Sequence, residues 1–148
     1  LGADFQRDPD GLPPNNLLNY GYTVLRAAVA RALCGAGLQP ALGLHHRHRA
    51  NPFCLADDLL EVLRPMVDAA VLNLYRSDRL VLDRPTKADL LGLLTRTVTV
   101  AGQAGPLMAG LHRMAASLVR VYRGDQQRLD LPERYKGANA GRRAISCS

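Results

Sequence analysis

The sequence predicts an all-α fold, a small bundle of four or five helices with one minor pair of strands. Apolar residues recur at helical spacing over long stretches, and segments rich in proline and glycine separate those stretches. The 148 residues are enough to bury one core, and a hydrophobic content of 47% argues against an intrinsically disordered chain. We therefore expect one α-helical domain over residues 1–148.

The first helix is predicted after an irregular lead-in. Residues 1–14 contain three prolines and two glycines, which favour irregular structure. Asn15 or Asn16 is a suitable N-cap, and the leucines, valines and alanines that follow form one apolar stripe. Gly35 and Gly37 predict the end of this helix, because glycine readily adopts the conformation that terminates one.

A loop and a second, interrupted helix come next. Residues 38–53 contain two prolines and show no sustained period, so we expect a connecting loop with a short extended piece at residues 41–44. Residues 53–80 return to helical periodicity. Pro65 lacks a backbone donor and crowds the preceding turn, which predicts a kink or break near Arg64.

The rest of the chain predicts two further helices and a basic tail. Thr86 and Asp89 resemble a capping box that opens a third helix. Residues 97–105 begin with four strand-forming residues and then turn. A last periodic segment closes at Gly124. Residues 134–148 carry several basic residues and no acid, so we expect a mobile basic tail.

Composition narrows the class of protein. The net charge of +6 favours a polyanionic partner, whereas an aromatic content of 5% without tryptophan disfavours recognition by base stacking. No long uncharged apolar run predicts a membrane span. Three widely spaced cysteines without a CxxC pair predict neither a disulfide framework nor a four-thiolate zinc site, which favours a cytoplasmic setting: Cys34, Cys54 and Cys147.

The densest polar cluster lies in the predicted loop. Three of the four histidines and two arginines fall within residues 45–49, and Asp57, Asp58 and Glu61 follow at the start of the next helix. Apolar neighbours crowd these acids, so at least one carboxylate should be partly buried and should need a cation or a metal. An arginine such as Arg64 could serve, and spacing alone leaves both possibilities open. Imidazole with carboxylates suits Mn²⁺ or Mg²⁺, and zinc is also compatible.

Three segments together resemble a known family, the CRISPR-associated adaptation integrase (the first-numbered CRISPR-associated protein), nearest to its type II branch. They are NYGYTVLR at residues 19–26, GLHHRHRANPFCLADDLLEVLRP at residues 43–65 and, more weakly, TVTVAGQAGPLMAGLHRMAASLVR at residues 97–120. The resemblance implies the helical catalytic domain of an enzyme that joins the 3′ ends of a short duplex, the prespacer, to the CRISPR repeat.

The resemblance also implies a metal site. It assigns His46 and Glu61 as ligands to Mg²⁺ or Mn²⁺, with His45 as the alternative histidine because neighbouring loop residues point in different directions. Asp58, one turn before Glu61, becomes an accessory acid or an outer group of the catalytic site. Five further residues are expected to position phosphates or the attacking hydroxyl: Tyr20, Tyr22, Arg47, Arg49 and Arg64.

The sequence departs from the family pattern at its beginning. The family's first ligand is a glutamate on a helix before the NYGY segment, but no glutamate precedes Glu61 here. The N-terminal β-rich domain that mediates dimerisation has no counterpart either. We therefore expect a C-terminal fragment that binds metal weakly and is inactive by itself. The intact parent is expected to be a homodimer that works with double-stranded DNA and a small ferredoxin-like adaptation protein.

Two other interpretations remain open. A non-catalytic helical module could bind duplex DNA through its basic faces, with the acids after Pro52 serving only as helix-start residues. A protein–protein docking module would instead show a large apolar surface patch. Convergence of His46 and Glu61 within metal-bridging distance would favour the integrase over both.

Overall fold

The computed structural model describes residues 13–45 and 50–133. Over these ranges the predicted helical character is confirmed, and the fold is mostly helical with one two-stranded antiparallel hairpin rather than purely α. In chain order the elements are α1 (Asn15–Gly35), α2 (Cys54–Leu60), the 3₁₀ turn η1 (Glu61–Leu63), α3 (Arg64–Arg76), α4 (Arg84–Leu91), the 3₁₀ turn η2 (Gly92–Thr95), β1 (Thr97–Val100), β2 (Gln103–Pro106) and α5 (Leu107–Arg123).

Helix α1 has the predicted extent but a different start. The N-cap is Pro14, and Asn15 and Asn16 both lie inside the first turn. Asn16 nevertheless serves the helix start, because its Oδ1 accepts from the backbone N–H of Leu17 at 2.8 Å. The helix ends before Gly37, whose φ of +77° reverses the chain. The predicted extended piece at residues 41–44 is wrong, since these residues form turns and a bend.

The predicted break in the second helix is confirmed. Helix α2 ends at Leu60, the 3₁₀ turn η1 follows, and α3 then begins with Pro65 in its first turn. Proline is tolerated there because its missing N–H would have no helical partner at that position. Glu61 begins the 3₁₀ turn that separates α2 from α3.

The predicted start of α4 is three residues too late. The N-cap is Asp83, whose side chain accepts from the backbone N–H of Thr86 at 2.9 Å. Thr86 is therefore inside the first turn, and Asp89 does not close a capping box. Asp89 instead forms an ion pair with Arg79, in the segment that connects α3 to α4.

The hairpin carries the chain from η2 to α5. Residues Thr97–Val100 pair antiparallel with Gln103–Pro106, so the predicted minor pair of strands is confirmed. Helix α5 ends as predicted, at Gly124 with φ +81°. The chain then returns along α5, where Arg120 pairs with Asp130 at 3.0 Å.

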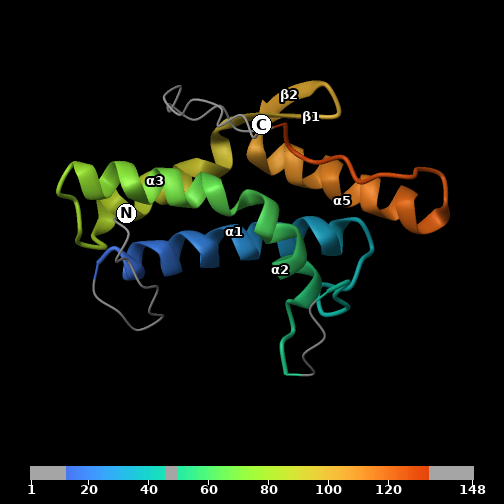
Figure 1. The fold of residues 1–148 in the computed structure, drawn as a ribbon, viewed down its shortest axis with the longest axis horizontal. Coiled ribbons are helices and arrows are strands. Elements are labelled where there is room, and N and C mark those ends of the chain that lie inside the picture. The colour runs from blue at the N-terminus through green and yellow to red at the C-terminus, as the bar shows by residue number, and fades with distance from the viewer. Residues whose placement is uncertain (1–12, 46–49, 134–148) are drawn as a thin grey trace, which may run out of the picture.

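The core lies between the helices. The long helix α1 crosses the middle of the molecule, with α3 beside its first half and α5 beside its second half (Figure 1). The apolar faces of these helices, together with residues from α2, η2 and β1, form one cluster of buried side chains. No helix in the described part of the chain is both long and apolar enough for a membrane crossing.

Candidate active site at the start of α2

Asp57 is the partly buried carboxylate that the sequence predicted. Its side chain is 14% exposed, and Arg26 Nε on α1 donates to its Oδ1 at 2.7 Å. The second carboxylate oxygen accepts from Asn51 Nδ2 at 2.8 Å. The cation that neutralises Asp57 is thus Arg26, which arrives from a distant part of the sequence, and not the nearby Arg64.

Asp58 contacts the loop that carries the histidines. Its Oδ2 accepts from the backbone N–H of Leu44 at 2.6 Å and from that of His45 at 2.9 Å. Asp58 also lies close enough to the end of α5 to act on Tyr122. Partial burial raises the pKa of the Tyr122 phenol, and the negative charge of Asp58 raises this pKa further.

Glu61 is the first residue of η1, directly after α2, and it is exposed to solvent next to Arg64. Arg64 Nη2 lies 2.9 Å from Glu61 Oε1, and the two side chains are 40% and 47% exposed. The Arg64 guanidinium also stacks over the Tyr22 ring, 5.4 Å from its centroid. Its Nε atom is buried and lacks a hydrogen-bond partner among the described residues. The structure therefore brings together Glu61, Arg64 and Tyr22.

The other residues that the sequence singled out are distributed differently. Tyr20 lies two residues from Tyr22, so it projects from another side of α1 and contacts Lys87 on α4, with Nζ 6.0 Å from the ring centroid. His46, Arg47 and Arg49 lie outside the described residues, and so does His48. In residues 13–45 and 50–133, no three His, Cys, Asp or Glu side chains are grouped to hold a metal ion.

Sequence reasoning missed Arg26 and Asn51. No local pattern links Arg26 to a residue of the distant α2. Asn51 had a local signal, since Asn before Pro is typical of a turn whose side chain bonds to the backbone two residues later. That bond is present: Asn51 Oδ1 accepts from the backbone N–H of Phe53 at 2.9 Å.

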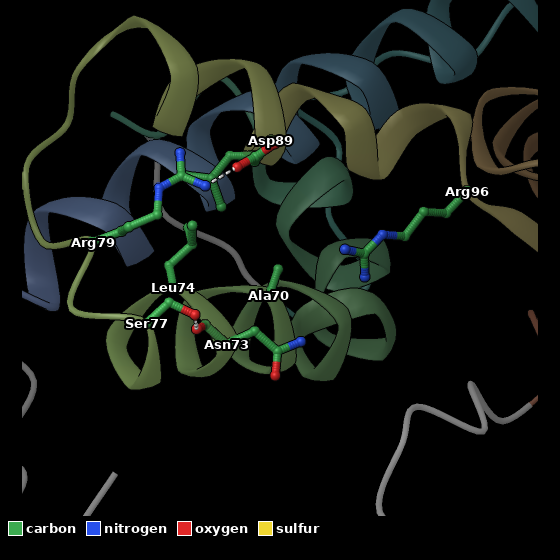
Figure 2. A pocket seen from close by; sticks show the side chains of 8 residues that line it. Ala70, Asn73, Leu74, Ser77, Arg79, Asp89 and Arg96 are labelled. Carbon is green, nitrogen blue, oxygen red and sulfur yellow. Dashed lines mark hydrogen bonds and ion pairs between the residues drawn. The ribbon is translucent and has the colours of Figure 1, made fainter.

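Two pockets elsewhere contain neither Asp58 nor Glu61. The first, about 260 Å³, lies between α3 and α4, where the Arg79–Asp89 pair closes one side and Arg96 reaches in from the other (Figure 2). The second, about 320 Å³, lies where the end of the return segment, residues 125–133, meets η1 and the start of α3. It is lined by Val62, Leu63, Pro65, Met66, Val98, Pro132 and Glu133.

Comparison with known proteins identifies relatives of this chain. Residues 6–97 match the family model described as CRISPR associated protein Cas1. The chain is 42% identical over 136 residues to the CRISPR-associated endonuclease Cas1 of Neisseria meningitidis serogroup C (strain 8013), an alignment that covers 90% of this chain and 44% of the relative. It is 32% identical over 119 residues to the CRISPR-associated endonuclease Cas1 2 of Pyrobaculum aerophilum, covering 78% of this chain and 40% of the relative.

The fold is also found in a solved structure. A casposase bound to its integration product superposes with a TM-score of 0.70 at 24% sequence identity, covering 86% of this chain and 42% of that chain. The chain therefore spans less than half the length of the curated relatives and of the casposase. Because the matched family model extends over more than half of its residues, this chain belongs to the Cas1 family of CRISPR-associated proteins.

Proposed function

We propose that this chain is the metal-binding lobe of a DNA endonuclease and integrase that inserts prespacer DNA into a CRISPR array. The relatives are named CRISPR-associated endonucleases, and the similar solved structure is a casposase with its integration product. In the complete protein we expect double-stranded DNA, both prespacer and repeat, as the substrate. A homodimer and the small ferredoxin-like adaptation protein complete the proposed assembly.

One observation carries the proposal: the Asp58 carboxylate holds the backbone of His45 at 2.9 Å. Asp58 and Glu61 are three residues apart, and residues at this spacing lie on one face of a helix, about 4.5 Å apart along its axis. The residues immediately before His46 are therefore tied to a side chain three positions before Glu61. This arrangement supports a site in which a loop imidazole and the Glu61 carboxylate bind the same ion.

The donor set fits Mg²⁺ or Mn²⁺. Glu61 offers an exposed carboxylate, and its present partner, Arg64, is a cation that a divalent ion would replace. A bound ion would activate a water molecule or a DNA 3′-hydroxyl and stabilise charge on the reacting phosphorus. Two protein ligands leave most of an octahedral shell to water, so we expect weak binding by this chain alone.

The arginines and Tyr22 would contact the DNA. Release from Glu61 would free the Arg64 guanidinium, which is already oriented by the Tyr22 ring at 5.4 Å, to contact a phosphate. Arg47 and Arg49 flank His48 in the loop and are proposed as further phosphate contacts. Tyr20 faces Lys87 instead, so any contact that it makes with DNA would lie on the α4 side.

The metal site can be tested by titrating the chain with Mn²⁺ and following paramagnetic broadening by NMR. We expect weak binding that broadens the signals of Glu61 and the loop histidines first. Glu61→Gln and His46→Ala should each weaken binding by about tenfold or more, whereas Asp89→Asn, which removes an exposed paired carboxylate elsewhere, should not. Equal weakening by Asp89→Asn would mean that only overall charge matters, and the proposed site would be wrong.

A non-catalytic DNA-binding module is the second candidate, and the Glu61–Arg64 pair favours it, because such i,i+3 pairs are common on helix surfaces without any metal. The two candidate functions can be distinguished by measuring strand joining with a longer polypeptide that contains this chain. The integrase requires that Glu61→Ala and His46→Ala abolish joining while duplex binding is retained. Normal joining by either variant would exclude the assigned ligands.

A further inference from the structure

Tyr22 of α1 is held by two side chains of α3. Its hydroxyl donates to Asp68 Oδ1, and the Arg64 guanidinium lies over its ring, 5.4 Å from the ring centroid. Both contacts form because α1 and α3 are close together here: a Cβ atom on Gly21 would lie 2.6 Å from Val67 Cγ1. The ring of Tyr22 is partly buried and packs against the core. The phenol is therefore fixed both at its ring face and at its hydroxyl.

Arg64 lies between two carboxylates along the chain. Its Nη2 atom is 2.9 Å from Oε1 of Glu61, three residues earlier. Asp68 is four residues after Arg64, which is the other spacing that favours an ion pair on a helix. In the structure, however, Asp68 accepts the Tyr22 hydroxyl. The contacts thus run in a chain from Asp68 through Tyr22 to Arg64 and on to Glu61.

The order of these contacts explains why Asp68 matters to an arginine that it does not pair with. A cation over an aromatic ring is directed by the ring only if the ring itself keeps its orientation. A hydrogen bond from a hydroxyl to a charged acceptor is stronger than one between neutral groups, and Asp68 provides this bond to Tyr22. Asp68 and Arg64 are one turn apart on α3, so the ring is held between two points of a single helix.

We infer that Asp68 is a positioning residue for Arg64: through the Tyr22 hydroxyl it fixes the ring on which the guanidinium rests. The inference rests on the proposed function, in which an ion binds Glu61 and Arg64 turns to a DNA phosphate. Once the ion replaces Arg64 at Glu61, the Tyr22 ring still directs the guanidinium. Asp68 therefore sets where Arg64 meets the phosphate, although Asp68 contacts neither the DNA nor the ion.

Side-chain NMR of the intact chain tests the positioning itself. The ring current of Tyr22 should displace the δ protons of Arg64 upfield. Asp68→Ala removes the acceptor of the hydroxyl, and Tyr22→Phe removes the hydroxyl but keeps the ring, so each should reduce this displacement by about half or more. Asp68→Asn keeps an oxygen acceptor and should restore the displacement. Lys87, whose Nζ lies 6.0 Å from the Tyr20 ring centroid, is the internal control, and its signals should not move.

Two results would overturn the inference in this experiment. The first is an unchanged displacement of the Arg64 protons in Asp68→Ala. The second is a loss of displacement in Asp68→Asn that equals the loss in Asp68→Ala, because the negative charge of Asp68 would then act on Arg64 directly and the Tyr22 hydroxyl would have no part in it.

Strand joining by a longer polypeptide that contains this chain tests the purpose of the positioning. Asp68→Ala should lower the joining rate at saturating DNA by about tenfold or more, because a small displacement of a group beside the reacting phosphate is costly. The affinity for duplex DNA should change little, since most contacts remain. Asp68→Asn should recover most of the rate. Asp89→Ala, which removes a paired carboxylate of α4, is the matched control and should join strands normally.

A purely structural role for Asp68 would lower the Tm and leave the joining rate of the folded protein unchanged. A normal rate in Asp68→Ala would therefore overturn the positioning role. Failure of the unsubstituted polypeptide to join strands would instead overturn the proposed function, and the NMR comparison would still decide whether Asp68 fixes Tyr22 and Arg64.

Discussion

At the scale of single residues, similar carboxylates have different partners, and sequence spacing does not distinguish them. Asp57, Asp58 and Glu61 lie within five residues, yet they contact an arginine of α1, a loop backbone and a neighbouring arginine. The sequence correctly indicated that at least one of them would be partly buried, and it left open whether a cation or a metal would compensate its charge. It could not identify Arg26 as that cation, because the pairing depends on how α1 and α2 pack.

Asp83 shows the same limit at a helix end. The pattern Thr86–Asp89 matches a capping box, but the helix begins earlier because Asp83 offers a better N-cap and is followed by Pro85 in the first turn. The competing signal was present in the sequence, since an Asp that is followed two residues later by Pro also predicts a helix start. The two local motifs overlapped in the sequence, and the structure shows which of them starts the helix.

The Asp83 cap predicts a dependence of stability on pH. Hydrogen bonds from the Thr86 side chain and backbone lower the pKa of Asp83 below its ordinary value of 3.8. The charged carboxylate therefore stabilises the fold at pH values above 3.8, and this stabilisation is lost as the pH falls through the lowered pKa.

We expect the unsubstituted chain to have a higher Tm than Asp83→Asn at pH 6, and the difference to shrink at pH 3, as measured by circular dichroism. Asp125→Asn, an exposed aspartate after α5, controls for the loss of one charge. A difference that is the same at both pH values would contradict the charged cap.

At the scale of elements, α1 and α3 approach closely at Gly21. A Cβ atom on this residue would lie 2.6 Å from Val67 Cγ1, and Val67 is fully buried. The sequence motif NYGY contains this glycine, but its role could not be predicted, because the partner lies on a helix 46 residues away. Periodicity indicated the apolar stripe of the first helix and could not show where that stripe touches α3.

Gly21→Ala should therefore destabilise the chain despite the better helix propensity of alanine. Overpacking costs about 1–3 kcal/mol, and alanine in a helix recovers about 1 kcal/mol, which leaves a net loss of up to about 2 kcal/mol, and the 2.6 Å contact favours the upper part of that range. Urea unfolding measures this change. Gly92→Ala is the matched control, because Gly92 has φ −57° and no atom within 4 Å of an added Cβ. An unchanged free energy of unfolding in Gly21→Ala would mean that α1 and α3 can move apart at this contact without cost.

At the scale of the whole molecule, the order and extent of the helices could largely be predicted, whereas the return segment could not. Residues 125–133 have no helical or strand period, and they are held by tertiary contacts: Asp130 N–H donates to Ser117 Oγ at 2.8 Å, and Glu133 N–H donates to the carbonyl of Thr99 at 2.8 Å. Such contacts depend on elements that must already be in place. Leu44, His45 and Asn51 are held in the same way, by contacts to Asp57 and Asp58 of α2.

The net charge of +6 is a property of the whole chain, but its effect on DNA depends on which cations are already paired. Arg26, Arg64, Arg79 and Arg120 each form an ion pair with a carboxylate. A paired arginine releases few counterions when DNA binds, because its charge is already compensated. On the proposed function, the pair that DNA and metal must open is Glu61–Arg64, so removing the Glu61 charge should make Arg64 available to a phosphate.

The affinity of Glu61→Gln for duplex DNA should therefore fall more steeply with rising salt concentration than the affinity of the unsubstituted chain. Each newly neutralised phosphate adds about 0.9 to the slope of log affinity against log salt concentration, and one released arginine should add up to that amount. Adding Arg64→Ala should remove the increase. Asp89→Asn is the matched control, because it releases Arg79 beside the pocket between α3 and α4 (Figure 2). An equal increase in Asp89→Asn would show that DNA responds to charge anywhere on the surface, and Arg64 would lose its assigned place beside the reacting phosphate.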